Sequence, residues 1–446
     1  MLNKIVLVIT LTLVGSVLYS QNTSNTFLGS KGLYKMQQTK YTPVPKGYEA
    51  VFINHVGRHG ARHLTTDVNV SFAYKLLYKA DSLHELSAKG KLLKQKLEKL
   101  NIIEQGNIES ISEEGKKEQW EIAGRMYEHF MPVFQSDKPV INIGVTRKFR
   151  TAQTGEAFLQ KLKAEGKDPQ ITSAIDDTTL LFYFLSPAYS EFYRKGAPTK
   201  LIDALRTASK YEELTKRFTQ SFFQPDFFKN LQQRDYNRFT SDVFGFTAIF
   251  YSIQKEITEH GFTASEIDMK PFFTSTDLST LGRIDDAEDF FLKGPGEDIN
   301  GIQIKIAVPL LANFINTTDE YIQSKKVNAQ LRFTHGETIA PFAAIMGIKG
   351  ASTPVTDIKT FDKEWSAGKI MPLSSNIQWI LCEKKGSENY LIKFLLNEKE
   401  VAIDGLSPKT FPFYNWKDVR EFYKNKIEKF GSSLNENGYY YLLNLN

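Results

Sequence analysis

A histidine lies between two arginines in the segment Arg58-His59-Gly60-Ala61-Arg62. Each guanidinium disfavours protonation of the imidazole beside it, and each must itself be balanced by an anion, for which phosphate is the natural candidate. A neutral His59 could attack phosphorus while Arg58 and Arg62 bind the phosphate oxygens. Gly60 would let the backbone approach the phosphate closely. The alternative for this segment alone is a strand end that carries surface charges.

A second group of basic residues follows the apolar segment 140–145, which reads as a strand. Strand ends on one side of an open sheet meet at one crevice, so Arg147 or Arg150 could face the same phosphate. A helix is expected to begin at Thr151, and cations are unfavourable at a helix N-terminus unless an anion lies there. The alternative for either arginine is a solvated residue at a helix start.

The third polar segment, His335-Gly336-Glu337-Thr338, places a carboxyl group two residues after a histidine. Because an alkoxide is a poor leaving group, cleavage of a phosphate monoester benefits from an acid that protonates the ester oxygen. Glu337 could be that acid, and His335 a further phosphate donor. The alternative for Glu337 is a first-turn residue that offsets the helix dipole. Bound phosphate should raise the pKa of Glu337 and the arginines should lower that of His59, which predicts an acidic or mildly acidic optimum.

These segments are predicted to lie on an α/β fold, with a mostly parallel open sheet flanked by helices. Strands are expected at residues 51–55, 140–145, 329–334, 377–382 and 390–396, and helices at 72–100, 113–130, 151–159 and 339–346. Strand signals nearly vanish between residues 151 and 300, where helices are expected at 211–223, 241–261 and 285–293. We therefore predict an α/β core of residues 21–165 and 301–446, with a helical insert, residues 166–300, that covers the active site.

The first twenty residues have the layout of a secretory signal peptide, with a basic start, an apolar run over 5–18 and a small Ser20. Cleavage after Ser20 would give an exported protein, periplasmic or secreted, without integral membrane association. A retained anchor is the alternative, although the run is short for a membrane span. A single cysteine, Cys382, excludes an internal disulfide and is expected to be a buried thiol.

Composition is globular, with 41% apolar and 24% charged residues, and the net charge of the 446-residue chain is +5. This mild excess fits a small polyanionic phosphate ester as partner better than a nucleic acid. We expect no metal and no other cofactor, because the remaining histidines lack metal-ligand spacing; they are His55, His63, His84, His129 and His260.

Taken together, the three segments resemble the histidine acid phosphatase branch of the histidine phosphatase superfamily. Residues 56–62 match its N-terminal signature and residues 150–158 its third-arginine segment; residues 111–115 and 123–125 are similar to the helix between them. Most of the branch has His-Asp where this chain has His335-Gly336-Glu337. That spacing, and residues 287–296, are similar to the multiple inositol polyphosphate phosphatases, which include bacterial phytases.

The resemblance implies that His59 is the phosphate-accepting nucleophile and Glu337 the proton donor. It also implies a set of residues around the phosphoryl group: Arg58, Arg62, Arg150 and His335. Two departures from the family pattern are His63 in place of the usual proline and Gly336 in place of the usual alanine.

The implied activity is hydrolysis of inositol polyphosphates such as phytate through a phosphohistidine. Alternatives are a broad-specificity acid phosphatase on sugar phosphates or bisphosphoglycerate, a mutase-like phosphotransferase, and a non-catalytic phosphoester-binding protein. By analogy the insert would supply Lys or Arg for peripheral phosphates. Those residues, the positional specificity and the oligomeric state are left open.

Overall fold

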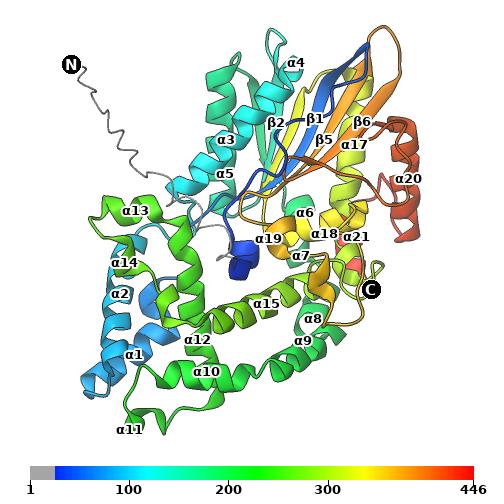
Figure 1. The fold of residues 1–446 in the computed structure, drawn as a ribbon. Coiled ribbons are helices and arrows are strands. Elements are labelled where there is room, and N and C mark those ends of the chain that lie inside the picture. The colour runs from blue at the N-terminus through cyan, green and yellow to red at the C-terminus, as the bar shows by residue number, and fades with distance from the viewer. Residues whose placement is uncertain (1–25, 446) are drawn as a thin grey trace, which may run out of the picture.

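The computed structural model describes residues 26–445 of the chain. Its centre is an eight-stranded sheet with the order β3-β2-β4-β1-β5-β6-β7, in which β8 pairs with β6 (Figure 1). The strands are β1 (Tyr48–Arg58), β2 (Val140–Val145), β3 (Gln170–Ile175), β4 (Ala329–Thr334), β5 (Asn376–Lys384), β6 (Tyr390–Leu396), β7 (Lys399–Glu400) and β8 (Tyr414–Asn415). The five predicted strands are confirmed as β1, β2, β4, β5 and β6, whereas β3, β7 and β8 are not among those predicted.

The α/β class is confirmed, and the sheet is mixed. Strands β1 to β4 pair in parallel, while β5 to β8 add on antiparallel, so the expected parallel sheet is the half that contains β1 to β4. In this half Arg58 pairs with Thr334, and Val145 pairs with Phe333. The segments that follow β1, β2 and β4 therefore leave the sheet at the same edge.

Helices occupy much of the remaining described chain. They are α1 (Phe72–Ser82), α2 (Ala88–Glu104), α3 (Glu113–His129), α4 (Met131–Phe134), α5 (Phe149–Glu165), α6 (Asp177–Leu180), α7 (Phe182–Leu185), α8 (Pro187–Lys195), α9 (Ala197–Ala208), α10 (Tyr211–Gln220), α11 (Pro225–Phe228), α12 (Gln233–Ile249), α13 (Gln254–Glu259), α14 (Ala264–Ile267), α15 (Ser275–Leu292), α16 (Ile302–Lys305), α17 (Val308–Ser324), α18 (Gly336–Met346), α19 (Ala367–Ile370), α20 (Trp416–Lys429) and α21 (Gly438–Asn444). None of the helices within residues 26–445 is long and apolar enough to span a membrane. The predicted signal peptide, residues 1–20, lies outside the described residues.

Side chains alternate between the two faces of the sheet along each strand, so both faces carry apolar residues. Helices cover both faces. On one face Ile53 of β1 packs in a core with Met126 of α3 and Phe158 of α5. On the other face Phe52 packs in a core with Phe314 of α17. Figure 1 shows α3 and α5 on one side of the sheet and α17 and α20 on the other.

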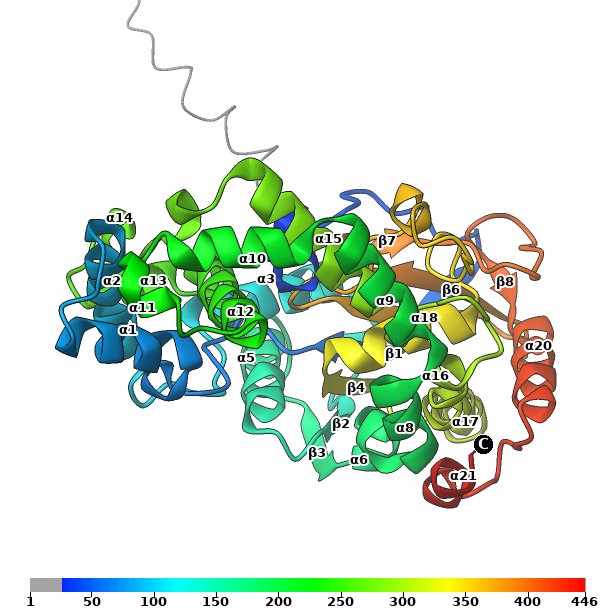
Figure 2. The same ribbon diagram turned by 90° about the horizontal axis from the view of Figure 1, so that it is seen from below.

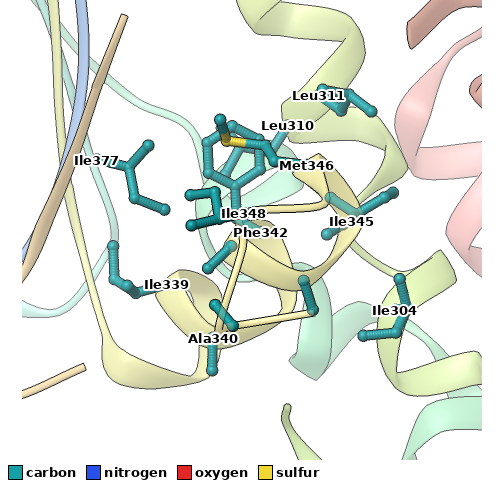
Figure 3. Packing of buried hydrophobic residues seen from close by; sticks show 14 of the residues in the cluster. Ile304, Leu310, Leu311, Ile339, Ala340, Phe342, Ile345, Met346, Ile348 and Ile377 are labelled. Atoms are coloured by element: carbon teal, nitrogen blue, oxygen red, sulfur yellow. The ribbon is translucent and has the colours of Figure 1, made fainter. Parts of the chain in front are cut away.

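Helix α18, which begins directly after His335, is almost wholly buried. Figure 3 shows its side chains Ile339, Phe342 and Ile345 among the apolar residues of neighbouring elements, including Leu310 of α17. This packing fixes the helix along its length. The first turn of α18, which carries Glu337, is therefore held in place by the core.

A second hydrophobic core lies among the helices below the sheet in Figure 1. It joins Leu97 of α2 to Phe239 of α12, so a segment before residue 165 shares a core with the predicted insert. Figure 2 shows α8, α9, α10 and α12 in front of the sheet, on the side where β1 and β4 end. The helical segment predicted over 72–100 contains two helices, α1 and α2, separated by a turn in which His84 has φ 59°. The division into a core and an insert at residues 166–300 stays a prediction.

Candidate active site

The structure brings most of the predicted residues together where β1, β2 and β4 end. Arg58 is the last residue of β1, and the rings of His59 and His335 lie with their centroids 5.4 Å apart. Arg150 lies in the first turn of α5, and its Nη2 is 3.2 Å from Nδ1 of His335. Arg147 instead turns outward, is bonded to Asp177 and is largely exposed, so Arg150 is the arginine that β2 contributes to the site.

His59 has the protonation pattern of a nucleophile. Its Nδ1 lies 2.9 Å from the carbonyl oxygen of Gly60. A carbonyl only accepts hydrogen bonds, so Nδ1 carries the proton and Nε2 keeps its lone pair. Burial, followed by the charges of Arg58 and His335, lowers the pKa of His59 well below its usual value. The imidazole is therefore neutral, with Nε2 available to attack.

The loop that carries His59 is fixed against α3. A Cβ atom on Gly60 would lie 2.6 Å from the carbonyl oxygen of Gly115 in α3, a distance that no side chain tolerates. The amide of Gly60 also donates to Oγ1 of Thr154 at 3.2 Å, and the amide of Ala61 donates to Oε2 of Glu118 at 2.9 Å. The close approach that Gly60 permits in the structure is to α3, and its approach to a phosphate stays a prediction.

Three buried donors of Arg58 and Arg150 have no hydrogen-bond partner, although Nη1 of Arg150 lies 3.7 Å from Oε1 of Glu109. Nη1 of Arg58 donates to the carbonyl oxygens of Ser30 and Met371, each at 2.6 Å, but its Nε has no partner. In Arg150 both Nε and Nη1 are buried and without a hydrogen-bond partner. Buried donors are costly when unpaired, and guanidinium groups bind phosphate oxygens through two parallel hydrogen bonds. These donors are therefore able to bind a phosphate group.

Arg62 lies on the outer side of this site. With Arg58 it lines a cleft of about 360 Å³ against α12, and its Nη1 donates to the carbonyl oxygen of His63 at 2.7 Å. Burial, then the charges of Arg150 and Arg58, lowers the pKa of Arg62 to about 10, so it remains a cation at neutral pH.

His335 has protein partners on both ring nitrogens. Because a guanidinium only donates, the bond from Arg150 requires Nδ1 to accept, and Nε2 then donates to Oγ1 of Thr146 at 3.1 Å. Burial and the charge of Arg150 lower its pKa to about 3. His335 thus contacts Arg150 and Thr146 in the structure, and its role as a phosphate donor stays a prediction. Thr146, which the sequence analysis missed, directly follows β2.

Glu337 lies in the first turn of α18 beside a lysine that was not predicted for the site. Nζ of Lys293 is 3.5 Å from Oε1 of Glu337 and 2.8 Å from Oδ1 of Asp289. Partial burial raises the pKa of Glu337, but Lys293 and Arg58 lower it more, to about 2. This is the opposite of the direction expected for a proton donor. Lys293 lies within residues 287–296, whose similarity to the inositol polyphosphate phosphatases was the available signal.

The loop after Arg62 is held by a second unpredicted group. His63 is buried, with Nδ1 3.2 Å from Oε1 of Glu104 and Nε2 3.5 Å from Oε1 of Glu256. These carboxylates come from α2 and α13, so His63 ties the loop to the helices below the sheet. Within residues 26–445 no group of three or more His, Cys, Asp or Glu side chains is arranged to hold a metal ion.

Comparison with known families identifies the class of protein. The model of the histidine phosphatase superfamily (branch 2) matches residues 51–397, which is most of the chain, so the chain belongs to that branch. The resemblance drawn from the motifs is confirmed, and the chain is a phosphoric monoester hydrolase. Comparison with curated protein sequences gives no match.

Solved structures share this fold at low sequence identity. The multiple inositol polyphosphate phosphatase of Bifidobacterium longum, in complex with inositol hexasulfate, has a TM-score of 0.76 at 19% identity, covering 92% of this chain and 99% of that one. The phytase from D. castellii has a TM-score of 0.62 at 17% identity, covering 94% and 93%. The phytase of Hafnia alvei has a TM-score of 0.51 at 13% identity, covering 87% and 100%.

Proposed function

We propose that this chain is an exported phosphatase that hydrolyses phosphomonoesters of inositol polyphosphates, including phytate, through a phosphohistidine intermediate. The observation that carries the proposal is a neutral His59 with a free Nε2 beside buried guanidinium donors of Arg58 and Arg150 that have no hydrogen-bond partner. Export rests on the layout of the first twenty residues.

In the first half of the reaction, Nε2 of His59 attacks phosphorus and the bond to the ester oxygen breaks. Arg58, Arg62 and Arg150 bind the non-bridging oxygens and offset the charge of the transition state. The leaving alkoxide takes its proton from the acid, Glu337. In the second half, water attacks the phosphohistidine, its proton passes to the Glu337 carboxylate, and inorganic phosphate is released.

The acid role of Glu337 requires a proton that it does not hold at mild pH in the structure, where its pKa is about 2. Lys293 and Arg58 are the main charges that lower this pKa. A bound phosphate ester brings negative charge next to the same cations, which raises the pKa of the carboxyl group. The substrate therefore prepares its own proton donor.

The substrate class is supported by the protein of the same fold that binds inositol hexasulfate, a sulfate analogue of a cyclic polyphosphate. One feature favours a second candidate, a broad-specificity acid phosphatase on sugar phosphates or bisphosphoglycerate. In the cleft lined by Arg58 and Arg62, the further cation is Lys31, whose Nζ already bonds Asp285 at 2.7 Å. This wall offers a peripheral phosphate little free positive charge.

The test is phosphate release from phytate, with EDTA present, by wild type, His59→Ala and Glu337→Gln. We expect His59→Ala to lose activity and the acid-quenched phosphoenzyme. Glu337→Gln should lower kcat by roughly 10²- to 10⁴-fold, the usual contribution of a general acid. The exposed Glu388→Gln serves as the matched control and should behave as wild type.

The outcomes separate the alternatives. Faster release from sugar phosphates than from phytate would select the second candidate. Phosphate binding without release by wild type would indicate a binding protein, and transfer of the phosphoryl group to a second alcohol would indicate a phosphotransferase. Loss of activity in EDTA would overturn the mechanism.

A further inference from the structure

Within residues 26–445, three buried residues other than glycine have a positive φ, a conformation that is costly for a residue with a side chain. Asn397 and Glu398 form the two-residue turn between β6 and β7, and such hairpin turns require it. The third, Ser374, has φ 58° and is 1% exposed. It lies in a turn closed by the amide of Ser375, which donates to the carbonyl oxygen of Pro372 at 3.1 Å, at a position where glycine is usual. Such strain persists only where the surrounding structure holds it, and it gathers at functional sites.

Ser374 is bonded to the main chain of the nucleophile. Its amide donates to the carbonyl oxygen of His59 at 3.1 Å. Its hydroxyl donates to Oε2 of Glu118 at 2.6 Å and accepts from Nε2 of Gln119 at 2.8 Å, so α3 anchors the side chain. Rotation about φ would turn the amide away from His59 while the side chain stays anchored. The strained conformation is therefore what joins His59 to α3 through Ser374.

Glu118 joins three segments that lie far apart in the chain. Its side chain is buried, and all of its hydrogen-bond partners are donors. Oε1 accepts from the amide of Tyr34 at 2.8 Å, and Oε2 accepts from the amide of Ala61 at 2.9 Å and from the hydroxyl of Ser374. The N-terminal segment, the nucleophile loop and the turn before β5 thus meet at one carboxyl group of α3. This group fixes the loop at two points, the carbonyl of His59 and the amide of Ala61.

We propose that Ser374 and Glu118 are positioning residues for the phosphatase reaction, which hold the main chain of His59 so that Nε2 faces the phosphate. The inference rests on the proposed function and adds two residues that act through the nucleophile. The ring of His59 follows its main chain, because Nδ1 is bonded to the carbonyl oxygen of Gly60 at 2.9 Å. A displacement of about 1 Å can lower the rate by roughly 100-fold. Loss of either positioning residue should therefore lower kcat.

Two substitutions at Ser374 separate positioning from packing. Ser374→Ala removes the hydroxyl and keeps the strain, whereas Ser374→Gly removes both, because glycine adopts a positive φ at little cost. With the ester that wild type hydrolyses fastest, kcat should fall by roughly 100-fold in Ser374→Ala and by less than about tenfold in Ser374→Gly. A role in packing alone gives the opposite order, since glycine leaves the larger cavity. Ser375→Ala is the matched control and should keep the wild-type kcat, because the buried Ser375 hydroxyl has no hydrogen-bond partner.

Glu118→Gln tests the other member of the pair. Glutamine keeps the shape but has one acceptor oxygen, so at least one of the three donors loses its partner. We expect kcat to fall by roughly tenfold, about the value of one hydrogen bond, while inhibition by inorganic phosphate stays near that of wild type. In the double variant with Ser374→Ala, the loss should be smaller than the product of the single losses, because the two residues act as a unit. Glu128→Gln, at an exposed position of the same helix, is the matched control.

Wild-type kcat in Ser374→Ala, a loss in Ser374→Gly as large as in Ser374→Ala, or independent losses in the double variant would each overturn the inference. Nitrogen NMR of protein with labelled histidine gives a readout without turnover. The ring of His59, assigned by the absence of its signals in His59→Ala, should be protonated at Nδ1 in wild type and in Ser374→Gly, and should show mixed tautomers in Ser374→Ala. An unchanged spectrum of Ser374→Ala refutes the inference. Failure of the proposed function is a separate result, because it appears as wild type that releases no phosphate while these spectra still differ.

Discussion

Replacing His63 with glutamine removes a cation that is buried between two carboxylates. Nδ1 of His63 lies 3.2 Å from Oε1 of Glu104, and Nε2 lies 3.5 Å from Oε1 of Glu256. The carboxylates have other bonds as well: Glu104 accepts from the amide of Leu64 at 2.8 Å, and Glu256 accepts from the amide of Glu113 at 2.7 Å. The imidazolium therefore connects the loop beside Arg62 to α2 and α13 and, through Glu256, to α3.

The stabilisation by His63 depends on pH in a direction that follows from its pKa. Burial lowers the pKa of His63, but the hydrogen bonds and charges of Glu104 and Glu256 outweigh burial and raise it to about 9. The rise of the pKa from the ordinary 6.5 corresponds to about 3 kcal/mol of stabilisation of the folded state, because each pKa unit is worth roughly 1.4 kcal/mol. Because the folded state holds this proton more tightly, the stabilisation is fully present below pH 6.5 and is lost as the pH rises through 9.

Urea unfolding of wild type and His63→Gln at pH 6 and pH 9.5 measures this quantity. The difference in unfolding free energy between the two proteins should shrink by about 3 kcal/mol from the lower to the higher pH. Titrating groups that do not contact His63 act on both proteins alike, and the exposed His84→Asn is the control for a histidine without buried carboxylate partners. Parallel pH profiles of wild type and His63→Gln would refute the reasoning.

Three further substitutions test the site and its support. Gly60→Ala would force a Cβ to within 2.6 Å of the carbonyl oxygen of Gly115, so the nucleophile loop must shift and kcat should fall by roughly 100-fold; wild-type kcat would contradict this. Arg150→Ala should weaken competitive inhibition by inorganic phosphate by roughly 10- to 150-fold, because hydrogen bonds to a charged group contribute about 1.5–3 kcal/mol. The control is Arg147→Ala, which removes an outward-facing arginine and should leave the inhibition unchanged. Trp379→Ala removes an indole side chain that is 1% exposed and leaves a cavity in the core, so the unfolding free energy in urea titrations should fall by about 3–5 kcal/mol. A loss below about 1 kcal/mol would show that the core collapses into the cavity.

The sequence was sufficient to predict the elements that end at the site, because their strands are buried. Strands β2 and β4 are mostly buried and carry apolar residues at every second position, and their bounds agree with the predicted segments. Strand β3 lies at the edge of the sheet, and nearly all of its residues are exposed or half-buried. An exposed edge strand needs no apolar pattern, so periodicity could not reveal it.

The residues that sequence analysis missed act through partners far away in the chain. His63 contacts Glu256 from a helix nearly two hundred positions later, and two helices and a strand lie between Lys293 and Glu337 in the chain. No local spacing reports such pairs, because only the packing of the helices on the sheet brings them together. The motif residues were predictable for the opposite reason: each lies at the end of its own strand or within a few residues after it.

The low pKa of Glu337 changes which group supplies the proton that makes the pH optimum of activity acidic. The optimum itself is still expected at acidic pH. A carboxyl group with a pKa of about 2 in the free enzyme is an anion at every pH at which the enzyme would work. The proton for the leaving oxygen must then arrive with the substrate, as the monoanion of the phosphate ester, and pass to Glu337 once phosphate has raised its pKa. A phosphate monoester loses its second proton near pH 6, so kcat/KM should fall above about pH 6. The pH at which kcat/KM falls should shift with the second pKa of the ester when an alkyl phosphate is exchanged for an aryl phosphate. If kcat/KM falls at the same pH for both esters, the titrating group belongs to the enzyme. Glu337 would then be protonated before substrate binds and would act as the acid directly.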